Sequence, residues 1–243
     1  MSDSADLHII RKAAEKASYS IARDFGELER LQSSKKGVNS FVAATIKSAR
    51  ERITEMLTQF RPDFHFLENT PNPKIKNAFI VNPICGLHNF KRGIPYFSIN
   101  IALSNAGEIV SGITLEPLKG DCFCAQAGGG TFLGNKTRLR VSSRDMLDGA
   151  LISVNGFNDL AKFSNNNLEI RKTGSVALDL VYLAAGKYDA VIAKDIEFSE
   201  IASGILQTKE SGGFVNFSVQ TNGQYSIFAA SSLRLLNTVS ALF

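Results

Sequence analysis

Residues Ala78 to Phe97 read A-F-I-V-N-P-I-C-G-L-H-N-F-K-R-G-I-P-Y-F. The first half of this stretch is rich in β-branched and aromatic residues and ends at a proline and a glycine, which predicts a buried strand that opens into a tight loop. The polar segment after the loop has the composition of a helix start, where backbone N–H groups are free to bind anions. We therefore expect a small-anion site formed by Gly86, Leu87 and His88.

The same loop lacks acidic side chains. A loop that handles phosphate together with Mg²⁺ normally supplies carboxylates, because this small, hard ion prefers oxygen ligands in octahedral geometry. The candidate positions are instead occupied by Asn82, Ile84, Cys85 and Leu87. The stretch predicts the scaffold of a metal-dependent phosphate site without its acids.

The composition is that of an ordinary folded protein. The chain has 243 residues, of which 44% are hydrophobic, so it can bury a sizeable core as one large domain or two packed ones. A net charge of +4 is too small and dispersed to indicate nucleic-acid binding by itself. No apolar run is long enough to span a bilayer and the first residues lack a signal core, so we expect a cytoplasmic protein without membrane contact.

The three cysteines, Cys85, Cys122 and Cys124, form neither an even disulfide set nor a zinc-ligand pattern with histidines. Cys122 and Cys124 are two positions apart in a predicted strand, so their side chains share one face. We expect them to pack as small apolar groups, which fits the reducing cytoplasm.

The N-terminal half, residues 1–145, is predicted to be an α+β unit of two long helices and an antiparallel meander. Helical spacing of apolar residues predicts helices over 2–25 and 41–60, with a polar turn over 27–37 between them. After the helices, strands are predicted over 65–67, 97–103, 109–115, 121–127 and 131–133, with hairpin turns at Ala106-Gly107 and Lys119-Gly120. The cluster Gly128 to Gly130 fits a bulge and tight turn better than a phosphate cradle.

A polar segment over 141–148 marks a boundary, after which residues 146–243 form the second half. Strands and helices alternate there, which predicts an α/β unit with a mixed sheet flanked by helices. The predicted strands are 151–154, 188–193, 213–219 and 227–230, and the predicted helices are 173–184, 199–211 and the tail from residue 232.

The loop resembles the metal loop of the inositol monophosphatase family, W-I-x-D-P-I-D-G-T-x-N-F. Here F-I-V-N-P-I-C-G-L-H-N-F keeps the proline, the first isoleucine after it, the glycine, the asparagine and the final phenylalanine, and it lacks both aspartates and the threonine. Further family landmarks follow in order at residues 124–134, 171–177, 202–204 and 210–213. The resemblance covers nearly the whole chain and is nearest to the bacterial extragenic-suppressor (SuhB-type) branch.

This resemblance implies the layered α-β-α-β-α sandwich of the sugar phosphatases, a homodimer, and hydrolysis of phosphate monoesters with two or three Mg²⁺ ions. The family's metal positions fall at Glu68, Asn82, Ile84, Cys85 and Ser199, and its catalytic positions at Glu68 and Leu87. Glu68 keeps its carboxylate, and we leave open whether it is a remnant ligand or a solvated loop acid. The resemblance also assigns substrate contacts to Gly174, Ser175, Val176 and Ala193.

One carboxylate therefore stands where the family has four. At ~4 Å and an effective dielectric near 20, each carboxylate offers a divalent ion roughly 8 kcal/mol of gross Coulomb attraction, part of which desolvation offsets. Nucleophilic catalysis is also disfavoured, because Ser199 has no adjacent base and neither His65 nor His88 has the partners of a triad.

We expect no cofactor, with Mg²⁺ bound only where residual activity remains. The leading hypothesis is a non-catalytic protein that binds a protein or RNA-processing partner, as the resemblance to the extragenic-suppressor branch suggests. Two alternatives stay open: an Mg²⁺-dependent hydrolase of inositol monophosphate or a related sugar phosphate, and a small-anion sensor at the Gly86 loop.

Overall fold

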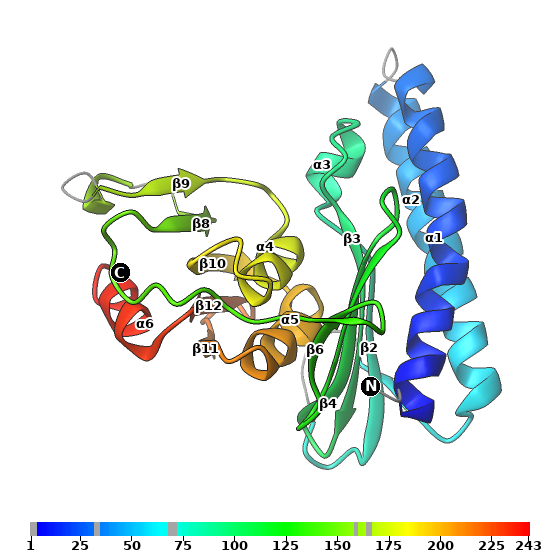
Figure 1. Cartoon of the computed structure of the whole chain (residues 1–243). Helices are drawn as coiled ribbons and strands as arrows, with labels where there is room; N and C mark the ends of the chain where they lie inside the picture. Colours follow the sequence, from blue (N-terminus) through cyan, green and yellow to red (C-terminus); the bar gives the residue numbers. More distant parts are fainter. Residues whose placement is uncertain (1–3, 32–34, 68–71, 158–159, 164–166) are drawn as a thin grey trace.

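The computed structural model describes residues 4–31, 35–67, 72–157, 160–163 and 167–243. Five layers follow one another in Figure 1: two long helices, a first sheet, two central helices, a second sheet, and the C-terminal helix. This is the α-β-α-β-α arrangement that the sequence predicts.

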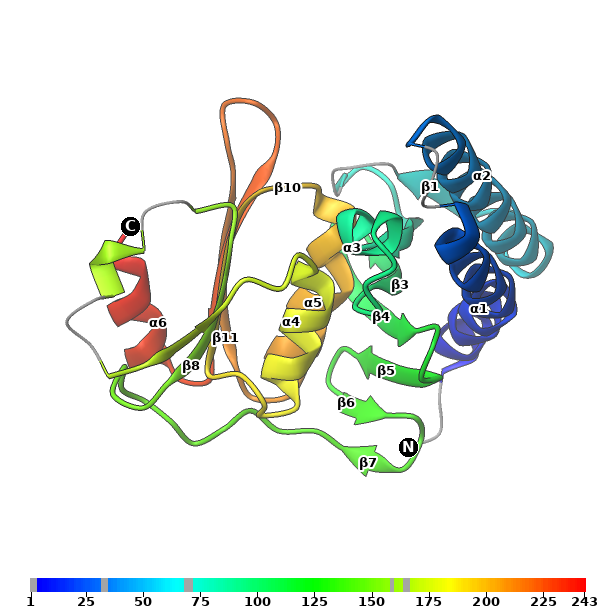
Figure 2. The same ribbon diagram turned by 90° about the horizontal axis from the view of Figure 1, so that it is seen from above.

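Helices α1 (Ala5–Leu31) and α2 (Lys35–Phe60) lie side by side on the outer face of the first sheet (Figures 1 and 2). The prediction of a polar turn over all of 27–37 is wrong at both ends, because α1 continues to its residue 31 and α2 begins at its residue 35; the part of the predicted turn over 32–34 lies outside the described residues. Leu28 explains the longer α1: it is fully buried and extends the apolar stripe that includes Ile21 by two turns. Within the described residues no helix is long and apolar enough to cross a membrane.

The first sheet has seven strands in chain order, with β1 parallel to β2 and every later pair antiparallel. The predicted hairpin turns are confirmed by positive φ angles at Ala106, Gly107 and Gly120. Short helix α3 (Leu87–Lys91) separates β2 from β3. The strands are β1 (His65–Leu67), β2 (Asn77–Cys85), β3 (Ser98–Asn105), β4 (Glu108–Glu116), β5 (Asp121–Gln126), β6 (Gly130–Leu133) and β7 (Thr137–Arg138).

The second sheet is mixed, as predicted, with strand order β11-β12-β10-β8-β9. Strands β9, β8 and β10 run parallel, β12 pairs antiparallel with β10, and β11 pairs antiparallel with β12. Helix α6 (Leu233–Ser240) packs on the outer face, and the boundary near residue 145 falls between β7 and β8. The strands are β8 (Leu151–Asn155), β9 (Glu169–Arg171), β10 (Ala190–Ile196), β11 (Phe214–Val219) and β12 (Tyr225–Ala230), and a single 3₁₀ turn spans Ala161–Phe163.

Helices α4 (Val176–Ala184) and α5 (Phe198–Glu210) lie between the sheets (Figure 1). The contact between them is close: a Cβ atom built on Gly204 of α5 would lie 2.8 Å from the Cβ atom of Leu180. Helix α4 begins three residues later than predicted, because Gly174 has φ +78° and cannot continue the helix backward.

Buried polar side chains fix α5 against the first sheet. The Oγ1 atom of Thr114 lies 3.1 Å from the Oγ atom of Ser203 and donates to Oε1 of Gln207 at 3.0 Å. The side-chain amide of Gln207 donates in turn to the carbonyl oxygen of Phe123 at 2.9 Å. Because all these groups are buried and paired, they specify how the helix sits on the sheet.

The glycine cluster is a turn, as predicted, and it binds a carboxylate of the same chain. Gly128 and Gly130 have positive φ angles, and their N–H groups each donate to a carboxylate oxygen of Glu210 at 2.8 Å. The last residue of α5 thus occupies the anion-binding geometry of this turn.

The prediction that Cys122 and Cys124 pack as small buried groups is confirmed. Both side chains lie on β5 beneath α1, with 6% and 3% of their surface exposed. All three cysteines are free thiols.

Two glycine-to-alanine substitutions test the contact between the central helices. Gly204→Ala is expected to destabilise the protein by about 1–3 kcal/mol, because the new methyl group overlaps Leu180. The matched control is Gly26→Ala in α1, where nothing lies within 4 Å of the added Cβ atom and the higher helix propensity of alanine is expected to stabilise by up to about 1 kcal/mol. Urea unfolding measures both, and equal stabilities of the two variants would contradict this account.

Candidate functional site

The candidate site lies where the end of β2 meets the start of α5. Asn82 and Ser199 are 117 residues apart in sequence, and the side-chain amide of Asn82 donates to the Oγ atom of Ser199 at 3.3 Å. The pairing of β2 with β3 shifts register between Asn82 and Cys85, which places Cys85 opposite Ser98. The structure therefore brings Asn82 and Ser199 into contact, and Cys85 lies at the end of the same strand, close enough to Glu200 to feel its charge.

The local backbone explains how these side chains are presented. Oδ1 of Asn82 accepts a hydrogen bond from the N–H group of Ile84 at 3.2 Å, which spans Pro83 and turns the strand end. The side chain of Ile84 is buried in the core between the first sheet and α1 and α2. Cys85 is almost completely buried, and burial, followed by the nearby charge of Glu200, raises the pKa of its thiol.

Glu200 adds a carboxyl group to this region. The sequence analysis did not select this residue. It is the third residue of α5, and its Oε2 atom accepts from the N–H group of Glu197 at 3.4 Å in a capping box. Burial is the main cause that raises the pKa of Glu200. In the sequence, Glu197 and Glu200 are three positions apart at a predicted helix start, and this spacing indicates a capping box.

The loop after β2 lies against the loop before α4. Gly86 has φ +88°, and a Cβ atom there would come within 3.0 Å of both the Cβ atom of Ser175 and the carbonyl oxygen of Tyr96. Glycine is therefore required for this close approach. Leu87 is half-buried against the core and His88 is exposed. The helix that follows has only five residues and a correspondingly weak dipole, so the anion site at this loop stays a prediction.

Asn89 joins the same two loops by hydrogen bonds. Its side-chain amide donates to the carbonyl oxygens of Tyr96 and Thr173, each at 2.8 Å. A Cβ atom on Gly174 would lie 3.2 Å from the Asn89 side chain, so this glycine also permits close packing. Asn89 thus ties the N-terminal half to the C-terminal half beside the site.

A fully buried carboxylate forms hydrogen bonds with the loop before α4 and with neighbouring elements. Asp179 in α4 accepts hydrogen bonds from Tyr96 Oη at 2.9 Å, Ser153 Oγ at 2.6 Å, Asn155 Nδ2 at 2.8 Å and Thr173 Oγ1 at 2.7 Å. Burial raises the pKa of Asp179, and the four donors oppose this shift. Sequence reasoning missed Asp179, although an acid within the apolar run V-A-L-D-L-V-Y-L-A was a visible signal.

Three remaining positions lie apart from this cluster or outside the described structure. Val176 is buried at the start of α4, and Ala193 is fully buried in β10, both within the core between the second sheet and the central helices. Their contact with a substrate stays a prediction. Glu68 lies outside the described residues.

The donor atoms that meet here do not fit Mg²⁺. Asn82 offers an amide, Ser199 a hydroxyl and Cys85 a neutral, soft thiol, whereas Mg²⁺ prefers carboxylate oxygens. Over the described ranges, no three His, Cys, Asp or Glu side chains gather as a group that could hold a metal ion. The arrangement provides hydrogen-bonding groups and a closely packed surface between the two halves.

Comparisons with known proteins agree with this fold. Residues 4–236 match the inositol monophosphatase family. An inositol-1-monophosphatase of Caulobacter vibrioides is 37% identical over 221 residues, which cover 83% of this chain and 85% of the relative. A Nus factor SuhB of Haemophilus influenzae is 31% identical and covers 86% and 84%.

Among solved structures, the extragenic suppressor protein suhB from Bartonella henselae superimposes with a TM-score of 0.83 at 31% identity, covering 98% of this chain and 99% of that one. An inositol monophosphatase from Anabaena shares the fold at a TM-score of 0.78 and 22% identity, over 97% and 93% of the two chains. The chain therefore belongs to the inositol monophosphatase family.

Proposed function

We propose that this family member does not hydrolyse phosphate monoesters with Mg²⁺ and acts as a non-catalytic binding protein in the cytoplasm. The contact between Asn82 and Ser199 carries the proposal. Two neutral side chains meet at 3.3 Å, at positions where the resemblance to the family places two metal-binding aspartates. A direct hydrogen bond satisfies these groups without an ion between them.

The other metal and catalytic positions support the same conclusion. Cys85 replaces a hard carboxylate with a buried thiol whose pKa is raised, and Leu87 replaces a threonine hydroxyl with a side chain that packs on the core. Glu200 supplies a carboxyl group, but its oxygen accepts the capping hydrogen bond of α5. Removing carboxylates also removes their mutual repulsion, so the fold gains stability without metal.

The names of the relatives support both the regulatory role and the alternative. The likeness to the Nus factor SuhB of Haemophilus influenzae supports binding of a protein or RNA-processing partner, and the resemblance to the family supports a homodimer. The likeness to the inositol-1-monophosphatase of Caulobacter vibrioides supports an Mg²⁺-dependent hydrolase of inositol monophosphate or a related sugar phosphate. The neutral side chains at the site support the non-catalytic role over the hydrolase, and the site is the better guide because one fold hosts several functions.

A phosphate-release assay tests the loss of activity. Purified protein is expected to release no phosphate from inositol monophosphate or fructose bisphosphate above the background measured with a chelator, at any Mg²⁺ concentration. We expect this result because Asn82, Cys85 and Ser199 carry neutral side chains, whereas Mg²⁺ prefers carboxylate oxygens. Turnover of roughly 1 per second or more that the chelator abolishes would establish the hydrolase instead.

Restoring the acidic side chains tests whether their absence is the reason why the site does not bind Mg²⁺. The combined variant Asn82→Asp, Cys85→Asp, Leu87→Thr and Ser199→Asp is expected to melt below the wild type without metal, because the new carboxylates repel one another. Mg²⁺ is expected to raise the melting temperature of this variant, by an amount equivalent to about 2.7 kcal/mol at a concentration 100 times the dissociation constant.

The wild type is the matched control, and its melting temperature is expected to be independent of Mg²⁺. Asn82→Asp alone is a second control, since a single added carboxylate is not expected to bind Mg²⁺ strongly. A metal-dependent rise in the wild type as large as in the combined variant would reject the proposed function.

A further inference from the structure

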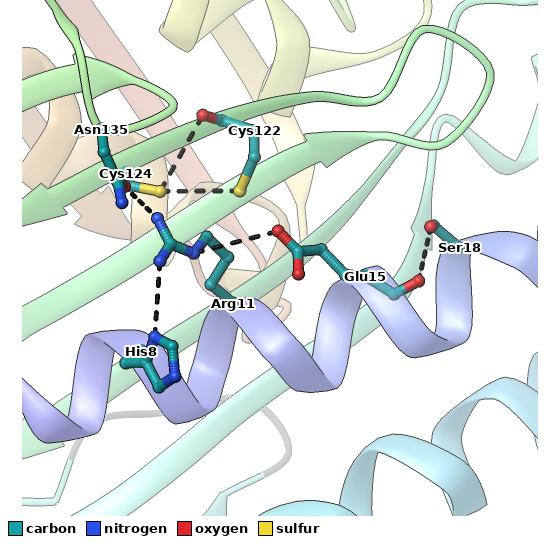
Figure 3. Close-up of polar contacts among 7 residues, drawn as sticks. All are labelled: His8, Arg11, Glu15, Ser18, Cys122, Cys124 and Asn135. Atoms are coloured by element: carbon teal, nitrogen blue, oxygen red, sulfur yellow. Dashed lines mark hydrogen bonds and ion pairs between the residues drawn. The ribbon is translucent and has the colours of Figure 1, made fainter. Parts of the chain in front are cut away.

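A pair of thiols lies away from the site described above. Cys122 and Cys124 project from one face of β5 toward α1, and their Sγ atoms are 3.5 Å apart (Figure 3). The alternation of side chains along a strand explains why residues two apart point the same way. Both cysteines are free thiols.

An open pocket reaches Cys122, whose Sγ atom lies 3.5 Å from that of Cys124. Its volume is about 480 Å³, and it is lined by Cys122, by Arg11 and Glu15 of α1, and by the turn between β6 and β7 that contains Asn135. The guanidinium group of Arg11 donates a hydrogen bond to Oδ1 of Asn135, and its Nε atom lies 3.9 Å from the Glu15 carboxylate (Figure 3). These contacts join α1 to the turn across the pocket, beside the thiols.

We propose that Cys122 and Cys124 form a dithiol site that binds trivalent arsenicals, with the organic group in the pocket. The sulfur spacing carries the proposal. If both sulfurs bond one central atom at about 2.3 Å, the length of a zinc–thiolate bond, then a separation of 3.5 Å gives an angle of about 100° at that atom. An angle below the tetrahedral value is what three-coordinate arsenic(III) adopts, because its lone pair occupies the fourth direction.

The reaction is a condensation without a change of oxidation state. Two As–S bonds form, the arsenic–oxygen bond breaks, and both thiol protons leave with the oxide oxygen as one water molecule. The product carries no charge, which suits a buried position because charged groups are costly to bury. The hydrogen bond to Cys124 and burial both raise the pKa of Cys122, so this thiol is neutral before the reaction as well.

The distance between the two sulfurs also favours arsenic(III) over copper(I) bound as a linear bis-thiolate complex. Such a complex would place the sulfurs about 4.6 Å apart at the same bond length of about 2.3 Å, about 1 Å more than observed, and would leave a negative charge between α1 and the sheet.

Phenylarsine oxide and native mass spectrometry test the proposal on the reduced full-length protein. One adduct per chain, with loss of water, is expected for the wild type and for the control Cys85→Ser, whose cysteine lies on β2. Cys122→Ser and Cys124→Ser each keep one thiol of the pair and are expected to bind at least tenfold more weakly, because the chelate is lost. A small dithiol is expected to remove the adduct, whereas the same concentration of thiol groups as glutathione is not.

A second measurement uses only the wild type and does not depend on how the variants fold. After reaction with phenylarsine oxide, the protein is unfolded, alkylated with iodoacetamide and mapped by peptide. Alkylation is expected at Cys85 and not at Cys122 or Cys124. An absent adduct, equal binding by the Cys122→Ser and Cys124→Ser variants and the wild type, or protection of Cys85 in place of the pair would overturn the proposal.

Discussion

The close approach of α5 to its neighbours is the constraint on which the structure depends. A Cβ atom on Gly112 of β4 would lie 3.0 Å from the Cα atom of Ser203, and Gly204 permits the equally close contact with Leu180 of α4. One helix can therefore touch the first sheet on one side and α4 on the other. The buried hydrogen bonds of Gln207 then fix the rotation of α5 about its axis. This fixed orientation places the first turn of α5, with Ser199, beside the end of β2.

The contacts that hold the layers together are separate from the positions that resemble a metal site. Ser203, Gly204 and Gln207 lie one to two turns further along α5 than Ser199, and each meets a partner that belongs to the sheet or to α4. Acidic side chains at the metal positions would add repulsion in the absence of an ion. Neutral residues at positions 82, 85 and 199 are therefore expected to avoid this repulsion while the contacts that hold the layers together are kept. A family member can lose metal-binding groups and remain folded for this physical reason.

Local sequence patterns predicted most of the elements, because strand alternation, helical spacing and glycine turns act over short distances. They failed where a tertiary contact decided the outcome. Residues 27–31 look like a polar turn, but they continue α1 because Leu28 finds a buried position against the sheet. The pairing of Asn82 with Ser199 followed only from the family resemblance, since no local pattern relates residues 117 positions apart. Asp179 and Glu200 were missed because their roles depend on donors contributed by other elements or by the helix start itself.

Hydrogen bonds between protein groups hold the loops around the site together, and this bears on how a partner would be bound under the proposed function. The side-chain amide of Asn89 donates hydrogen bonds to the carbonyl oxygens of Tyr96 and Thr173. The carboxylate of Asp179 accepts hydrogen bonds from the hydroxyl groups of Tyr96, Ser153 and Thr173. These bonds connect the loop after β2 to the loop before α4, so the two halves are joined at the site by protein groups alone. A preorganised surface loses little conformational entropy when it binds. For the proposed non-catalytic function, this preorganisation is an advantage for recognition of a partner.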